Sequence, residues 1–222
     1  MRTYLLYFLL ACFLSVSAAA QIRPGIRAGG LLSAPNIKSD VLVGVKPKPA
    51  PGWTAGVFTQ IPLGGNGWYV SPELSLLYYA YDADGTVNFP GVGTVAVTGN
   101  SNITYLNLPV HLGYVQPEGT VRFFAEAGGY MAVGLSGENN LKGMVGSQTF
   151  YNDGPIQFGR NNGEVRRTDL GASIAAGILL RNRFSIRIHA ANGFTTVSNE
   201  SFGSFRNRYI GLSLGFGGFS GE

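Results

Sequence analysis

The sequence predicts an all-β protein: an eight-stranded antiparallel up-and-down transmembrane β-barrel with short periplasmic turns and long extracellular loops. Three observations predict this fold. Apolar residues alternate with polar or small ones in eight separate segments, which is the period of a strand and not of a helix. Long and short connections alternate between these segments. Only 13% of the residues are charged, about half the usual share in a soluble domain.

The eight alternating segments are each long enough to cross a bilayer as tilted strands, which takes about 9 to 11 residues. Beyond the N-terminal segment, no run of about 20 apolar residues offers a helical span, so strands must do the crossing. The predicted strands cover residues 22–32, 53–63, 68–81, 103–115, 121–135, 165–180, 183–197 and 206–219.

The connections alternate in length along the chain. The short turns cover residues 64–67, 116–120 and 181–182, and the longer loops cover 33–52, 82–102, 136–164 and 198–205. Outer-membrane barrels have this asymmetry, with short periplasmic turns and longer extracellular loops. An even number of strands then leaves both ends of the barrel domain in the periplasm.

The alternation also predicts which side chains meet lipid. In the seventh strand, for example, Ile186 and Ile188 alternate with Arg187 and His189. A soluble lipocalin-like barrel would turn the apolar phase inward, but its water-facing phase should then be rich in Lys and Glu. Here that phase is dominated by Gly, Ser and Ala, and no lysine falls within a predicted strand. We therefore expect the apolar phase to face lipid.

The charged side chains of the strands are accordingly expected in the lumen. Three arginines and three carboxylates balance in sign, as an ion-paired, hydrogen-bonded plug requires. The six residues are Arg27, Glu73, Arg122, Glu126, Asp169 and Arg187.

Aromatic residues cluster where the predicted strands would cross the two membrane interfaces, a position that suits amphipathic rings. The expected periplasmic belt contains Trp68, Tyr69, Tyr114, Phe184, Phe216 and Phe219, and the expected outer belt contains Trp53, Tyr78, Tyr79, Tyr81, Tyr105 and Phe194.

The N-terminus has the features of a cleaved signal peptide at residues 1–20. Arg2 is basic, residues 4–16 are apolar, and small residues precede the expected cleavage before Gln21. Residues 21–222 then form a single barrel domain. An alternative is a lipoprotein cleavage box at Leu9–Cys12, which would place acyl chains on Cys12. In the signal-peptide interpretation, the one cysteine leaves with the leader.

The residues do not point to a catalytic, cofactor-binding or metal-ligating site. A Ser–His nucleophile or a paired acid and base would be needed for catalysis. The two histidines, His111 and His189, fall in the luminal phase, and Glu73 and Glu126 are expected to be ion partners of the luminal arginines. No His/Cys cluster or phosphate-binding glycine loop is present, and the net charge of +4 does not indicate nucleic acid.

Several short motifs resemble the PorT-like outer-membrane β-barrel family of Bacteroidota. They are Gly25–Gly29, Ala55–Phe58, Ser71–Leu74, Tyr105–Val110, Ala127–Gly128 and Gly211–Phe216. The resemblance implies an eight-stranded outer-membrane barrel inserted by the barrel assembly machinery. Most members have no assigned role, and the founding member is an accessory of type IX secretion and gliding. One departure is that Ser220, Gly221 and Glu222 follow Phe219, whereas such barrels often end on an aromatic residue.

The sequence therefore predicts an integral outer-membrane protein with a non-enzymatic structural, surface-loop or envelope-assembly accessory role. The alternatives are a lipid-modifying enzyme, a narrow pore, or a soluble periplasmic lipid carrier. The 136–164 loop is expected either to contact an envelope or secretion-complex partner or to fold back over the barrel mouth. We expect a monomer in contact with outer-membrane lipid, because a closed barrel leaves no strand edge to pair.

Overall fold

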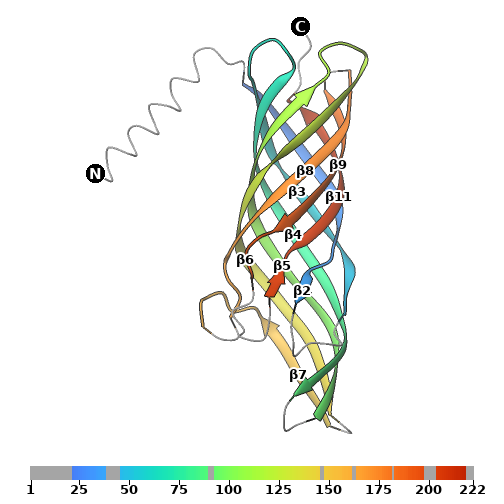
Figure 1. Ribbon diagram of the computed structural model, residues 1–222, viewed down its shortest axis with the longest axis vertical. Helices are drawn as coiled ribbons and strands as arrows, with labels where there is room; N and C mark the ends of the chain where they lie inside the picture. The colour runs from blue at the N-terminus through green and yellow to red at the C-terminus, as the bar shows by residue number, and fades with distance from the viewer. Residues whose placement is uncertain are drawn as a thin grey trace, which may run out of the picture.

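The computed structural model describes residues 22–38, 46–89, 93–145, 148–161, 164–181, 183–197 and 204–218. The expected signal peptide and residues 219–222 lie outside the described residues. Eight strands close into a ring in the order β5-β4-β3-β1-β11-β9-β8-β6, and β6 pairs with β5 to complete it (Figure 1). The predicted eight-stranded antiparallel barrel is therefore confirmed. No helix in the described part of the chain is long and apolar enough to cross a membrane.

The ring strands match the predicted segments in number and order, and differ mainly in length. Their bounds are β1 Arg23–Ser33, β3 Lys46–Pro62, β4 Trp68–Phe89, β5 Gly93–Val115, β6 Val121–Val145, β8 Thr168–Leu180, β9 Phe184–Gly193 and β11 Arg208–Gly217. Three further strands lie outside the ring: β2 Asn36–Lys38 pairs with β10 Ser204–Arg206, and β7 Gln148–Pro155 pairs with β6.

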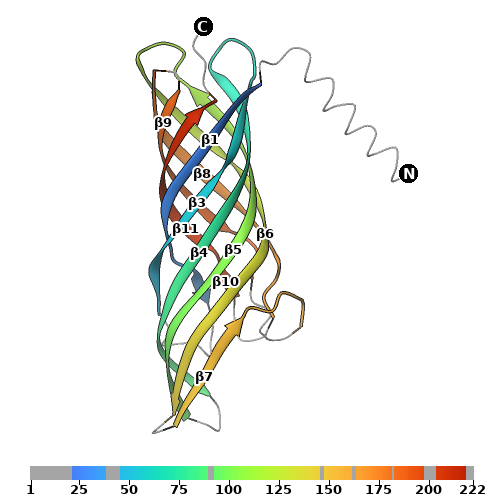
Figure 2. The same cartoon turned by 180° about the vertical axis from the view of Figure 1, so that it is seen from behind.

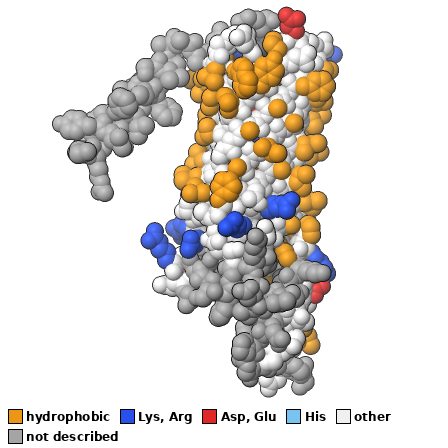
Figure 3. Space-filling model, in the orientation of Figure 1, with side chains coloured by type: hydrophobic (Ala, Val, Ile, Leu, Met, Phe, Trp, Pro, Cys, Tyr) orange, Lys and Arg blue, Asp and Glu red, His pale blue; other side chains and the backbone are white. Residues whose placement is uncertain are grey.

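The wall of the barrel is apolar and its lumen is polar, as predicted. Phe123 and Leu214 expose 64% and 63% of their surface, whereas all six charged residues expected in the lumen are buried. Figure 3 shows apolar side chains distributed along the visible barrel wall. An outward apolar belt and an enclosed polar phase are the arrangement that a strand-built membrane span requires.

The aromatic belts are confirmed only in part. At one end of the barrel Trp68 and Tyr114 lie 5.3 Å apart between ring centroids, and both are exposed on the wall. Three other expected belt residues point inward instead: Tyr69, Tyr79 and Tyr105 are buried at 3%, 2% and 1% exposure. All three belong to the polar phase of the alternation, so they face the lumen. A buried tyrosine hydroxyl usually has a hydrogen-bond partner.

The strands β4, β5 and β6 run well past the barrel, which corrects the expectation of long loops at 82–102 and 136–164. Together with the start of β3 and with β7 they form a sheet that extends beyond the ring (Figure 2). We call this sheet the blade: residues 46–49, 82–89, 93–101, 137–145 and 148–155. Its strands are rich in Gly, Asn and Asp, which are typical of turns and loops, so the sequence pattern did not indicate strands here.

The chain after β7 returns to the barrel and packs over its mouth. Ile156 is 8% exposed within the apolar cluster at that end, and Phe158 and Val165 pack against the same cluster. The expectation that the 136–164 segment folds back over the barrel mouth is thus confirmed for its last part, and a partner contact stays a prediction. The hairpin of β6 and β7 projects outward, and the return segment covers the mouth.

Candidate functional site

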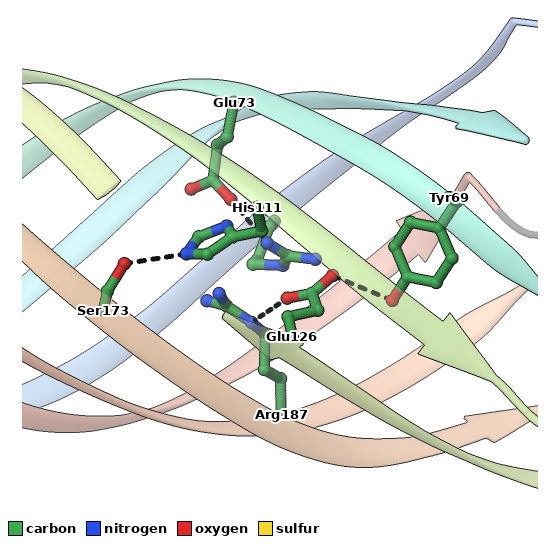
Figure 4. Close-up of polar contacts among 7 residues, drawn as sticks. Tyr69, Glu73, His111, Glu126, Ser173 and Arg187 are labelled. Carbon is green, nitrogen blue, oxygen red and sulfur yellow. Dashed lines mark hydrogen bonds and ion pairs between the residues drawn. The ribbon is translucent and has the colours of Figure 1, made fainter. Parts of the chain in front are cut away.

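The middle of the lumen holds two buried ion pairs, shown in Figure 4. Arg27 on β1 pairs with Glu73 on β4, and Arg187 Nε on β9 lies 2.8 Å from Glu126 Oε2 on β6. Tyr69 donates its hydroxyl proton to the other Glu126 oxygen, at 3.0 Å. Four strands therefore converge on one charge-balanced cluster.

The small residues of the luminal phase make this cluster possible. Arg27 and Glu73 come from strands separated by β3, where Gly56 stands directly opposite Arg27. Between Arg187 and its partner lies β8, where Gly177 stands opposite Arg187. Each long side chain can therefore lie across a neighbouring strand that offers no competing side chain. The many Gly, Ser and Ala residues of the luminal phase leave the space that these charged side chains occupy.

The remaining two charges do not join the cluster, which corrects the expectation of a single six-charge plug. Arg122 donates to the backbone carbonyl of Pro117 at 3.1 Å, close to the 116–120 turn. Asp169 lies toward the mouth and accepts hydrogen bonds from neutral groups. Its donors are Thr195 at 2.6 Å, Asn207 at 2.9 Å and Tyr130 at 3.2 Å.

The structure also brings His111 and Ser173 together, a contact that the sequence analysis missed. His111 Nε2 lies 2.7 Å from Ser173 Oγ. The two residues sit on β5 and β8 at the same level, each opposite Gly128 of the intervening β6. The register of the adjacent strands β5, β6 and β8 makes them neighbours, and spacing along the chain does not reveal that register. His189 has a different environment, edge-on to the Tyr209 ring at 5.7 Å.

Metal binding gains no support from this cluster. In the part of the chain that the structure describes, no group of three or more His, Cys, Asp or Glu residues is placed to hold a metal ion. His111 and Ser173 do not line the cavity at the barrel rim that is described below.

The blade presents large apolar side chains to water. Met144 on β6 and Phe150 and Tyr151 on β7 expose 50%, 55% and 63% of their surface. They lie beyond the barrel wall, where no acyl chain covers them. The ammonium group of Lys142 lies 5.6 Å from the Tyr151 ring centroid, within cation–π range.

The two edges of the blade differ in chemistry. At the β3 edge, Pro47 and Pro49 lack the N–H that a further strand would need, and Lys48 pairs with Asp84 at 2.7 Å. The hydrogen bond and charge of Asp84 raise the pKa of Lys48, so Lys48 is protonated at neutral pH. Prolines and lysines are the residues with which proteins block edge strands. The β7 edge has neither residue before Pro155, and the sheet has no described strand beyond it.

A closed ring with an apolar wall and a polar lumen defines the protein as an integral β-barrel of the outer-membrane type. The sequence comparison identifies its family. A model of the outer membrane protein beta-barrel domain matches residues 17–199, so the chain belongs to this family and its location is the outer membrane. No match was found among curated proteins.

Solved structures with a similar fold are small outer-membrane barrels. Ail of Yersinia pestis, in complex with the heparin analogue sucrose octasulfate, is 10% identical with a TM-score of 0.41; the alignment covers 88% of this chain and 98% of that one. Neisserial surface protein A is 9% identical over 87% and 96% of the two chains, with a TM-score of 0.43. OprG of Pseudomonas aeruginosa is 12% identical over 89% and 96%, with a TM-score of 0.44.

Proposed function

We propose that this protein is a non-enzymatic outer-membrane barrel that holds the blade outside the membrane to contact a protein partner in the cell envelope. The observation that carries this proposal is the unblocked β7 edge with its exposed Phe150 and Tyr151. An exposed strand edge is a template for pairing with another chain. A partner segment that adds a strand there would gain backbone hydrogen bonds and cover these side chains.

The asymmetry between the edges favours a dedicated contact over an accidental one. The β3 edge carries prolines and a charge pair, whereas the β7 edge carries aromatics. Both edges belong to one sheet and meet the same solvent. Blocking one edge and leaving the other open directs pairing to a single side of the blade.

The resemblance to the PorT-like family of Bacteroidota supports the choice of partner class. It implies an accessory role in envelope assembly or secretion, in which the barrel anchors a contact surface. We accordingly place the partner among envelope or secretion-complex proteins, and regard the barrel assembly machinery as a partner during insertion only.

Site-specific photocrosslinking in the cells that make the protein tests this proposal. A benzophenone amino acid at position 151 should give a discrete adduct with one protein. Adding the substitutions Gln148→Lys and Phe150→Lys, which place positive charge on the β7 edge, should abolish the adduct. The matched control, Thr86→Lys and Thr98→Lys, puts the same charge on exposed positions of the central strands β4 and β5 and should leave the adduct intact. Equal crosslinking from position 86 and position 151, or none from 151, would contradict the proposal.

The His111–Ser173 contact is the observation that favours a second candidate, a lipid-modifying enzyme, since a Ser activated by a His is a common nucleophile. Both side chains are buried, at 2% and 7% exposure, beside the ion pairs that fill the lumen. Comparing lipid A by mass spectrometry between cells with the native protein and cells with His111→Ala or Ser173→Ala decides between the two. We expect identical spectra; a shifted acyl pattern in both variants would establish the enzyme.

The ion pairs also bear on the pore alternative. An eight-stranded barrel has an interior just wide enough for its own side chains, and here Arg27, Glu73, Glu126 and Arg187 occupy its middle. We expect no steady current in planar-bilayer recordings of the purified protein. Stepwise conductance that changes with Glu126→Gln would show a pore instead.

A further inference from the structure

A cavity of about 830 Å³ lies at the rim of the barrel, between the apolar wall and the blade. Arginines dominate its polar lining: Arg160, Arg166 and Arg167 contribute to it, together with Thr168 and Thr195. No carboxylate is among its lining residues. Figure 3 shows basic side chains gathered on this face where the apolar wall ends.

The arginines are held on an anchored backbone. Gly134 N–H donates to the Arg167 carbonyl at 2.7 Å, and the Arg166 N–H donates to the Val197 carbonyl at 2.7 Å. The Arg167 guanidinium lies 5.6 Å from the Phe158 ring centroid, which orients its plane. The side chains of Arg160 and Arg167 are exposed, so a ligand can reach both guanidinium groups.

The charges of Arg160 and Arg167 are not neutralised by an ion pair within the described residues. None of them forms an ion pair with Arg160 or Arg167, although other arginines of the barrel do form such pairs. The nearby carboxylate of Glu164 is turned into its own loop, where it accepts from Asn161 N at 2.7 Å and Asn161 Nδ2 at 3.1 Å. These hydrogen bonds lower the pKa of Glu164, so the carboxylate that accepts them is ionised at neutral pH.

The position of the cavity indicates what fills it. Leu170, which lines the cavity, is 45% exposed and begins the lipid-facing phase of β8. Phe194, 60% exposed, follows the end of β9 at the same rim. Arginine donors therefore adjoin apolar wall at the depth where a lipid changes from acyl chain to headgroup. Guanidinium groups bind phosphate by paired, charge-assisted hydrogen bonds.

We propose that this cavity, the rim cavity, binds the phosphate group of an outer-leaflet lipid headgroup through Arg160 and Arg167. Arg166, Thr168 and Thr195 line the same pocket, and Leu170 contacts the apolar part of the lipid. The proposal is independent of the blade, since the cavity contains no blade residue. It therefore stands or falls separately from the proposed partner contact.

Titration calorimetry of the full-length barrel in octyl glucoside, a phosphate-free detergent, tests the site. Diphosphorylated lipid A should bind, and the variant Arg160→Gln with Arg167→Gln should bind about tenfold or more weakly, the loss expected for two charge-assisted contacts. Arg160→Lys with Arg167→Lys should retain part of the affinity. The matched control, Arg181→Gln with Arg183→Gln, removes the same charge at the opposite turn and should bind like the native protein.

Two further arms identify the ligand. Chemically dephosphorylated lipid A should bind the native protein weakly. Its affinity should not exceed that of diphosphorylated lipid A for the Arg160→Gln, Arg167→Gln variant. Inorganic phosphate should compete only weakly, because it lacks the apolar contact with Leu170. Equal affinity for the dephosphorylated lipid, or equal affinity of the native protein and the Arg160/Arg167 variant, would overturn the site. Inorganic phosphate that binds as tightly as the lipid would overturn the assignment to a headgroup.

Discussion

Glu126 shows how a charge can be enclosed in a barrel without destabilising it. It is 3% exposed, and it accepts from Arg187 on one oxygen and from Tyr69 on the other. A buried carboxylate without such partners would carry a desolvation cost of several kcal/mol. The pairing therefore lets the luminal charges contribute to a unique register of the strands around them.

Removing one member of this pair should be costly because it leaves the other charge buried and alone. We expect Glu126→Ala to lower the free energy of unfolding by about 3–5 kcal/mol. The double variant with Arg187→Ala should recover part of the loss. Urea unfolding in lipid vesicles, followed by the heat-dependent shift on SDS gels, measures both.

The exposed pair of Lys48 and Asp84 provides the control for that experiment. Both side chains are more than half exposed to solvent, so the pair is screened. Asp84→Ala should leave the unfolding transition unchanged. A Glu126→Ala barrel as stable as this control would show that the luminal pair has no structural role.

Gly128 is a second residue whose neighbours leave no room for a side chain. A Cβ added there would lie 2.0 Å from the Val110 carbonyl oxygen and 2.8 Å from the His111 Cα. Gly128→Ala should therefore destabilise the barrel by about 1–3 kcal/mol through overpacking. It should also separate His111 from Ser173.

The adjacent Gly129 offers a matched comparison. It faces outward, and a Cβ added there would meet only the Gly171 carbonyl at 3.6 Å, an ordinary contact. Gly129→Ala should leave the urea midpoint nearly unchanged. Equal midpoints for the two variants would contradict the crowding that the geometry indicates at Gly128.

At the scale of the elements, the β6–β7 hairpin and the return segment have separate roles. Replacing residues 141–152 by Asn-Gly should give a barrel that folds like the native one, because Asn140 and Asp153 are paired and a two-residue turn can join them. Deleting 140–160 should instead disrupt the barrel mouth, since it removes the buried Ile156. The heat-dependent gel shift checks both constructions; a truncated hairpin that fails to assemble would show that the blade is required for folding.

The blade also qualifies the expectation of a monomer. That expectation rested on the absence of a free strand edge, which holds for the closed ring but not for β7. The expectation of a monomer therefore stays a prediction, because β7 leaves a strand edge outside the ring.

For the whole molecule, the orientation of the wall decides every other assignment. Apolar side chains point outward along all eight ring strands, and the charged set is enclosed. The ends of the wall carry aromatic pairs: Trp68 with Tyr114 at one end, and Trp53 stacked with Tyr78 at 6.0 Å at the other. This is the distribution of an outer-membrane barrel with two interfacial belts.

The two tryptophans, the only ones in the chain, report this orientation directly. Trp53 and Trp68 are 44% and 47% exposed on the wall. In vesicles, lipids brominated near the headgroup should quench both strongly, and lipids brominated deep in the acyl chain should quench them less. The variants Trp53→Phe and Trp68→Phe isolate each signal. Efficient quenching by aqueous iodide with none from brominated lipid would show that these side chains are not in the membrane.

The sequence by itself determined the eight ring strands, their order and which phase faces lipid. Each ring strand faces acyl chains on one side and a crowded lumen on the other. Its side chains therefore alternate with a period of two residues, and this local pattern is visible in the sequence. Arg27, Glu73, Glu126 and Arg187 were expected inside for this reason, and they are there.

Only the tertiary structure decided the rest. The His111–Ser173 contact depends on the register of three adjacent strands, and the rim cavity depends on how the segment after β7 packs against the barrel. The blade escaped detection because its strands are rich in Gly, Asn and Asp, which are typical of turns and loops. The lipid-facing residues could be predicted from the sequence, because the alternation is local. The contacts between luminal residues and the sheet beyond the ring required the tertiary structure.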